Sequence, residues 1–268
     1  MPANQQAAAT EIGRFGDVDA TGEAERFIAF LEHIESLPLS METRERSYAL
    51  LQPQMDDAVV DVGCGTGKAV AELTARGAGA SGIDVSERMI TLARRRFPTG
   101  DFRVAAAEDL PFEDGMLQGY RAERVYQHLH DPAVALAEAW RVLASGGRIV
   151  LIDQDYDMWA VDSADQATTR ALARAFADSI THPWIGRQYR GLLLDAGFTD
   201  VTIEIKPLTF TSYADAAPGL MGAAEAAVAS SAVTREQADA WLAEQRQRDE
   251  RGRFFMAMAL FLASARKP

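Results

Sequence analysis

The chain has 268 residues, 48% hydrophobic and 25% charged, which is enough for one sizeable α/β core with residues left over for a lid or an insertion. Its formal net charge of −12 disfavours nucleic acids and anionic membrane surfaces as partners, because phosphate binding needs clustered Lys and Arg. The single cysteine excludes an internal disulfide framework. Finding no apolar signal or membrane span, we expect a cytoplasmic monomer or homodimer that acts on a small molecule.

Helical periodicity follows a polar, Ala- and Gly-rich stretch over residues 1 to about 20. Two helices are predicted next, over residues 23–35 and 40–51. Five strand-like runs then alternate with helical stretches, which predicts a mostly parallel sheet with helices on both faces. The runs cover residues 59–62, 80–84, 102–105, 117–122 and 148–153, and the helical stretches include residues 86–96 and 132–143.

Beyond the fifth run, helices are predicted over residues 164–179 and 187–196, and strands over residues 201–205 and 254–265. Two more Ala-rich helical segments lie within residues 213–250. They are longer than a simple crossover needs, so we interpret them as an insertion that covers the substrate side.

The expected domain organisation follows from these elements. Residues 1–52 form a tail and a helical lid, and residues 53–268 form a Rossmann-like domain. Residues 206–250 are the insertion on the substrate side of that domain.

The most specific motif is an apolar strand that breaks into glycines, Val59-Val60-Asp61-Val62-Gly63-Cys64-Gly65-Thr66-Gly67. A turn that lies against a flat ligand favours glycine, because a Cβ would restrict φ and block close approach. The next strand ends in Asp84, at about the distance where nucleotide-binding folds place a carboxylate on ribose hydroxyls. The G-x-G-x-G spacing differs from the G-x-G-x-x-G of dinucleotide folds, so it predicts a nucleoside site without a pyrophosphate.

The residues VDVGCGTG followed by GIDVS resemble the class I S-adenosylmethionine-dependent methyltransferases. The later pattern HPWIGRQYRGLLLDAGF is similar to bacterial methyltransferases of small-molecule and secondary metabolism. The resemblance implies a seven-stranded, mostly parallel sheet with an antiparallel last strand, S-adenosylmethionine as cofactor and S-adenosylhomocysteine as product. The cofactor-binding residues that it implies are Asp61, Gly63, Gly65, Gly67, Asp84, Val85, Met89, Ala107, Glu108, Glu123 and Arg124.

One of these positions departs from the commonest family pattern. This chain has Ala107-Glu108 where the commonest family pattern has a Gly-Asp pair. The side chain of Glu108 is one methylene longer than that of Asp. We expect its carboxylate to accept a hydrogen bond from the adenine amine in place of the Asp. The alternative for Glu108 is a solvated loop acid.

Ligands of such sheets bind outside the carboxyl ends of the strands, which places the residues after the fourth and fifth strands near the chemistry. Methyl transfer needs a base only when the acceptor loses a proton. His128 is the first candidate for that base, followed by Asp155 and Tyr156. The alternative for His128 is a structural histidine bonded to backbone at a helix start, and Asp131 is predicted to cap the next helix at Pro132.

Three aromatic residues are candidates for substrate binding, because substrate pockets are apolar with a few polar anchors. They are Tyr48, Tyr126 and Trp184, and for Tyr48 and Trp184 the alternative is packing between lid and sheet. Arg46 is a candidate for the donor's carboxylate, with a solvated helix face as its favoured alternative.

The sequence therefore predicts a methyltransferase that acts on O, N or C of a small, aromatic or apolar metabolite. Two alternatives stay open: a non-catalytic protein that binds S-adenosylmethionine, and an enzyme of the same fold that runs a non-methylating reaction. No metal is expected, because the acidic stretches lack His or Cys at site-like spacing.

Overall fold

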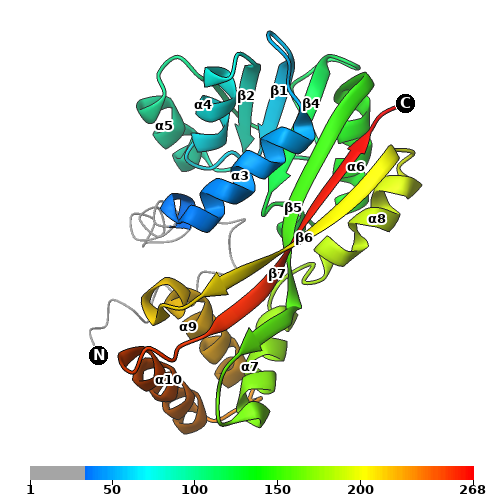
Figure 1. The fold of residues 1–268 in the computed structure, drawn as a ribbon. Coiled ribbons are helices and arrows are strands. Elements are labelled where there is room, and N and C mark those ends of the chain that lie inside the picture. Colours follow the sequence, from blue (N-terminus) through cyan, green and yellow to red (C-terminus); the bar gives the residue numbers. More distant parts are fainter. Residues whose placement is uncertain (1–33) are drawn as a thin grey trace.

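The computed structural model describes residues 34–268 (Figure 1). The helix predicted over residues 23–35 lies almost wholly outside these residues, as does the polar stretch before it. The strands are β1 (Ala58–Val62), β2 (Gly79–Asp84), β3 (Asp101–Val104), β4 (Leu117–Glu123), β5 (Leu143–Val161), β6 (Thr199–Phe210) and β7 (Met256–Arg266).

Helices connect these strands in the predicted alternation. They are α3 (Pro38–Leu51), α4 (Lys68–Ala75), α5 (Glu87–Arg96), the short 3-10 helix η2 (Tyr126–His128), α6 (Pro132–Val142), α7 (Gln166–Asp178), α8 (Ile185–Asp195), α9 (Tyr213–Ala229) and α10 (Arg235–Glu250). Asp131 caps α6 as predicted, since its carboxylate accepts from the backbone amides of Ala133 and Val134. Within the described helices, none is both long and apolar enough to cross a membrane.

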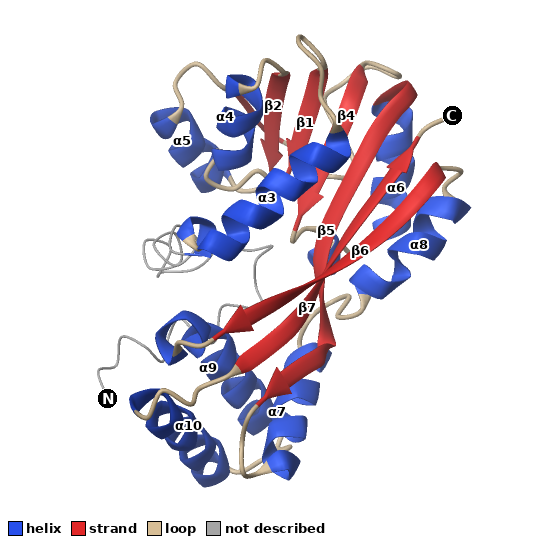
Figure 2. Cartoon of the chain, viewed as in Figure 1, coloured by secondary structure: helices blue, strands red, loops and turns tan. Residues whose placement is uncertain are grey.

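The strands form one seven-stranded sheet in the order β3-β2-β1-β4-β5-β7-β6 (Figure 2). β1 pairs in parallel with β2 and β4, and β4 pairs in parallel with β5. β7 runs antiparallel between β5 and β6. The predicted fold class is therefore confirmed.

Two strands, β5 and β6, are much longer than the sequence predicts, whereas β7 has about its predicted length. β5 has 19 residues, β6 has 12 and β7 has 11, and together they project beyond the rest of the sheet (Figure 1). A register shift between Asp155 and Trp159 leaves three extra residues on β5, so this strand bends and keeps pairing with β7 beyond the bulge. Helices α7, α9 and α10 pack together on this overhang and form a separate hydrophobic core with it.

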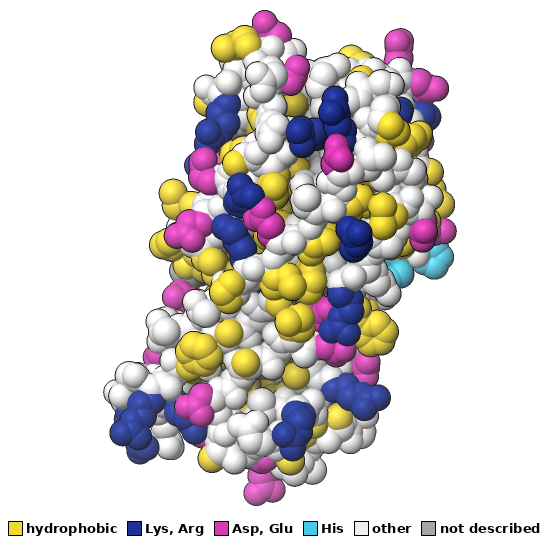
Figure 3. Space-filling view, turned by 45° about the vertical axis from the view of Figure 1, so that its right-hand side comes forward, with side chains coloured by type: hydrophobic (Ala, Val, Ile, Leu, Met, Phe, Trp, Pro, Cys, Tyr) yellow, Lys and Arg dark blue, Asp and Glu magenta, His cyan; other side chains and the backbone are white. Residues whose placement is uncertain are grey.

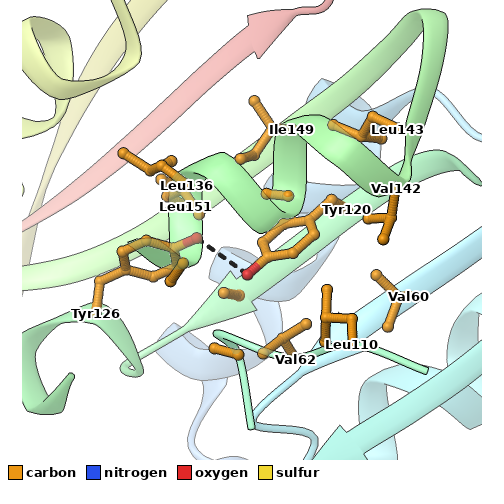
Figure 4. Packing of buried hydrophobic residues seen from close by; sticks show 14 of the residues in the cluster. Val60, Val62, Leu110, Tyr120, Tyr126, Leu136, Val142, Leu143, Ile149 and Leu151 are labelled. Atoms are coloured by element: carbon orange, nitrogen blue, oxygen red, sulfur yellow. Dashed lines mark hydrogen bonds between the residues drawn. The ribbon is translucent and has the colours of Figure 1, made fainter. Parts of the chain in front are cut away.

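Alternating side chains of the sheet divide the rest of the interior into two layers. Val59 faces the core built with α3, α4 and α5, whereas Val60 faces the core built with α6 and α8. Figure 4 shows the second of these layers, where Tyr120 and Tyr126 meet with their hydroxyl oxygens 3.0 Å apart. Burying each such aliphatic or aromatic side chain contributes about 1.5 to 3 kcal/mol. This packing holds the carboxyl ends of β1 and β4 side by side.

Candidate active site

A cavity of about 350 Å3 lies at the carboxyl ends of β1, β2 and β4, where ligands of parallel sheets bind. Its wall includes all but one of the residues predicted to bind cofactor, and the exception is Gly67. The predicted residues on the wall are Asp61, Gly63, Gly65, Asp84, Val85, Met89, Ala107, Glu108, Glu123 and Arg124.

The glycines of the loop after β1 serve different purposes. Gly65 has a φ of +50°, and no heavy atom of the described chain lies within 4 Å of a Cβ built on it. Gly65 also lines the cavity, so the open space beside its backbone is part of it. A Cβ on Gly67 would instead lie 2.8 Å from the ring of Phe102, so this glycine allows α4 to pack against the sheet.

Asp84 ties the glycine loop to the next strand. Its Oδ2 atom accepts from the backbone amide of Gly65 at 3.0 Å, and its Oδ1 atom accepts from the amide of Ser86 at 2.9 Å. A carboxylate is an acceptor-only group that can take several hydrogen bonds, so Asp84 has the chemistry to accept from hydroxyls of a ligand. The residue both shapes the loop and presents an acceptor beside it.

A buried ionic network forms the floor of the cavity. Arg121 is 2% exposed, and its guanidinium donates to Asp61 Oδ1 at 2.6 Å, to Ser47 Oγ at 2.8 Å and to Glu123. Burial raises the pKa of Asp61, and the charge of Arg121 opposes that effect. Asp61 and Glu123 are therefore held by Arg121 at the ends of β1 and β4.

An apolar strip lies on the side of the cavity nearest β2 and β3. Val85 is 54% exposed, although its side chain is large and hydrophobic, and it lies beside Met89 and Ala107. Glu108 follows Ala107 on the same wall. This wall therefore combines an apolar surface with a carboxylate acceptor.

Glu35 and Arg44 also lie on the cavity wall, although neither is among the residues predicted from the sequence. Glu35 accepts from Thr66 Oγ1 at 2.9 Å, and burial raises the pKa of Glu35. Arg44 donates to the Glu35 carbonyl at 3.0 Å and to Glu72 Oε2 at 3.2 Å. These partners are far apart in the sequence, and no motif marks them.

His128 lies on the cavity wall, where its neighbour Gln127 fixes the imidazole. Gln127 Nε2 lies 2.8 Å from His128 Nε2, and because an amide nitrogen only donates, this ring nitrogen is the acceptor. Burial and the positive charge of Arg124 lower the pKa of His128 to about 4. The ring is neutral at neutral pH, but it is a far weaker base than an ordinary histidine.

The other two candidate bases lie elsewhere. Asp155 is fully buried and its carboxylate is held by Arg187, with the Arg187 Nη2 atom 2.5 Å from Asp155 Oδ1. The Tyr156 hydroxyl donates to Gln154 Oε1 at 3.0 Å, and burial raises the pKa of Tyr156 far above its ordinary value. Neither residue lines the cavity at the glycine loop.

The predicted substrate-binding aromatics do not meet at this cavity either. Tyr48 and Tyr126 are 3% and 0% exposed, because each packs its ring in a core and satisfies its hydroxyl there. Tyr48 donates to Glu72 Oε2 at 2.8 Å, and Tyr126 pairs with Tyr120. Trp184 is 42% exposed and lines a separate open hollow beside α7. Arg46 bonds Glu204 on β6, with Arg46 Nε 2.8 Å from Glu204 Oε2.

We compared the sequence and the structure with those of known proteins to find the family of the chain. Residues 60–151 match the family described as a methyltransferase domain, and this range contains most of the cavity wall. The chain is 32% identical over 249 residues to a 37.1 kDa protein in a transposon of Streptomyces fradiae, a match covering 89% of this chain and 70% of that protein.

Two named methyltransferases are also similar. O-methyltransferase cnsE of Penicillium expansum is 35% identical over 170 residues, a match covering 59% of each chain. Phosphoethanolamine N-methyltransferase 2 of Haemonchus contortus, solved in complex with S-adenosyl-L-methionine, superposes with a TM-score of 0.63 at 15% identity, covering 95% of this chain and 60% of that one. The chain belongs to the class I S-adenosylmethionine-dependent methyltransferases.

Proposed function

We propose that the protein transfers a methyl group from S-adenosylmethionine to an oxygen of a small apolar molecule. The observation that carries the proposal is the open space beside Gly65, next to the Asp84 carboxylate. A ligand backbone can lie in that space while adjacent ribose hydroxyls donate to Asp84.

The rest of the cavity fits the same cofactor. We assign adenine to the strip of Val85, Met89 and Ala107, with Glu108 as acceptor for its amine. The methionine portion then lies toward the end of β4, over Glu123 and Arg124. The volume of about 350 Å3 is within the usual range of ligand pockets.

When bound, S-adenosylmethionine supplies a methyl group on a sulfonium, together with a good leaving group. The residues of this chain then have to align the acceptor with that methyl carbon and exclude water. Since the pKa of His128 is about 4, we do not assign general-base catalysis to this residue. Oxygen is the proposed acceptor atom because the similar enzyme cnsE is named an O-methyltransferase.

Calorimetry with S-adenosylmethionine, S-adenosylhomocysteine and NAD tests the cofactor assignment. We expect the two methionine derivatives to bind and the dinucleotide to fail, because the glycine loop has no pyrophosphate spacing. Transfer is then measured with a methyl-labelled donor and small hydroxyl compounds. Failure of both methionine derivatives to bind would overturn the proposal, and binding without transfer to any acceptor would favour a cofactor-binding protein.

A further inference from the structure

A second, smaller cavity of about 130 Å3 lies between the sheet overhang and the start of α3. β5, β6 and β7 contribute Trp159, Leu208 and Met258 to its wall, and α7 and α9 contribute Phe176 and Gly219. The cavity therefore lies where the overhang and its helices meet the rest of the molecule. Figure 3 shows hydrophobic side chains gathered across the middle of one face, with charged side chains spread above and below them.

The wall of this second cavity is mainly apolar and aromatic. The rings of Trp159 and Phe176 have centroids 5.3 Å apart, and Tyr156 packs edge-on against Phe176 at 5.5 Å. Met256 and Met258 add flexible thioethers, which make favourable contacts with aromatic rings. A cavity of about 150 Å3 lined by apolar residues holds one benzene molecule, so about 130 Å3 suits a single ring.

The two cavities adjoin each other at Arg124, which lies on the wall of both. A second connection runs through η2, because Gln127 on the second cavity bonds His128 on the first. A molecule in the second cavity would therefore reach the end of β4, where the methionine portion of the donor is proposed to lie.

The guanidinium of Arg124 has capacity for a ligand. Arg124 has a φ of +57°, and its backbone amide is fixed by the Ile152 carbonyl at 2.7 Å. Its Nη2 atom forms an ion pair with Glu123 Oε1 at 3.6 Å, a distance too long for a hydrogen bond, and the guanidinium makes no side-chain hydrogen bond within residues 34–268. Asp215, the other charged residue on the wall, already has an interaction partner.

We propose that the second cavity is the acceptor site and that it takes a single-ring phenol, with the ring among Trp159, Phe176 and Met258 and the hydroxyl against Arg124. This inference rests on the proposed methyl transfer. A guanidinium beside the hydroxyl stabilises the phenolate over the phenol, which supplies a nucleophile without a protein base. An amine acceptor fits less well, because its methylated product would carry a positive charge beside Arg124.

The reaction balances without another reactant. The hydroxyl proton leaves to solvent as the phenolate forms beside Arg124. The phenolate oxygen then bonds the methyl carbon while the carbon–sulfur bond breaks and its electron pair stays on sulfur. Arg124 acts only as a hydrogen-bond donor and takes up no proton in this step.

Filling the second cavity tests the location of the acceptor. No heavy atom of the described chain lies within 4 Å of a Cβ built on Gly219, which lines the cavity, so Gly219→Leu starts a side chain in open space there. Gly191→Leu is the matched control, because Gly191 lies on α8, is exposed and has equally open surroundings. Both changes favour the helix, since glycine is a poor helix former.

Phenol binding is measured by ligand-observed NMR on protein loaded with S-adenosylhomocysteine. We expect Gly219→Leu to weaken phenol binding by at least about tenfold, the factor that 1.4 kcal/mol produces, and to leave the cofactor affinity unchanged. Gly191→Leu should bind both as the wild type does. If phenol fails to bind the wild type, or binds Gly219→Leu equally well, the acceptor site is elsewhere even where the cofactor binds.

Arg124→Gln and Arg124→Lys test activation of the hydroxyl. In Arg124→Gln, the rate of transfer to phenol should rise only at a higher pH than in the wild type. The rate with 4-nitrophenol should fall much less than the rate with phenol, because 4-nitrophenol ionises more readily. Lys should restore part of the phenol rate. An equal loss for both phenols would overturn the activation, and weaker S-adenosylhomocysteine binding would assign the guanidinium to the donor's carboxylate instead.

Discussion

The side-chain amide of Gln127 donates to Nε2 of His128 over 2.8 Å and so fixes the imidazole at the edge of the cavity at the glycine loop. Consecutive residues of η2 point in different directions, because a 3-10 helix turns by about 120° per residue. Tyr126 enters the core, Gln127 reaches the second cavity and His128 reaches the cavity at the glycine loop. One short turn therefore links the core to both cavities.

The lowered pKa of His128 predicts a specific pH dependence of stability. An unfolded histidine takes up a proton near pH 6.5, whereas folded His128 stays neutral down to a pKa of about 4. The unfolded state thus binds more protons between these values, and His128 makes the protein less stable as the pH falls through that window.

His128→Asn should remove this contribution. Urea unfolding at pH 7 and at pH 4.5 is expected to show the wild type losing about 2 kcal/mol more than the variant, after discounting for partial exposure. Parallel losses would mean that the imidazole is protonated as readily in the folded protein as in the unfolded chain.

Asp84→Asn should weaken binding of S-adenosylhomocysteine by about 1 to 3 kcal/mol, because charged hydrogen bonds to ribose become neutral ones. Calorimetry measures the affinity. Glu113→Gln makes the same change of charge at an exposed loop outside the cavity and should have no effect. Equal affinities for Asp84→Asn and wild type would remove Asp84 from the cofactor site.

Gly65→Ala should impair cofactor binding through the added methyl group. Gly65 and Gly252 both have positive φ values, +50° and +63°, and both have open surroundings, but only Gly65 lies on the cavity. Each alanine should cost about 1 kcal/mol in backbone strain. We expect a tenfold or greater loss of S-adenosylhomocysteine affinity for Gly65→Ala alone; an equal loss in both variants would point to strain and not to occupied space.

The ion pair of Asp155 and Arg187 should contribute to stability and not to catalysis. Arg187→Met leaves a fully buried carboxylate without its main partner, and the expected loss in unfolding free energy is about 1 to 3 kcal/mol. Arg174→Met removes an exposed pair with Asp178 and should cost less than about 0.5 kcal/mol. A large fall in the transfer rate at unchanged stability would restore Asp155 as a candidate base.

Local chemistry explains which parts of the sheet and cofactor cavity could be predicted from the sequence. The glycine loop, the strand ending at Asp84 and the cap at Asp131 each depend on residues a few positions apart. Such signals are visible in the sequence because the backbone conformation they require is formed by neighbours.

The second cavity could not be predicted in the same way. Leu37, Phe176, Leu208 and Met256 come together only because the bulge after Asp155 keeps β5 paired with β7 beyond the expected end of the sheet. The predicted strands at residues 148–153 and 201–205 stop short of this overhang, since polar residues interrupt the apolar runs. Tyr48 and Tyr126 are predicted to bind substrate only because they are aromatic. In the sequence, a tyrosine of the core cannot be told from a tyrosine of a pocket, because the partner of its hydroxyl is not visible there.

The overhang also separates the residues proposed to contact the acceptor from the residues proposed to contact the donor. Donor contacts are proposed at the strand ends of the main sheet, whereas α7 and α9 stand on the projecting tips of β5, β6 and β7. Substitutions on the cavity-facing sides of these helices can reshape the space for the acceptor while the loop at Gly65 and Asp84 stays intact. To change the acceptor, α7 and α9 should therefore be randomised first. Substitutions there that abolish transfer should still leave donor binding intact, so folded variants can be recognised by their donor affinity.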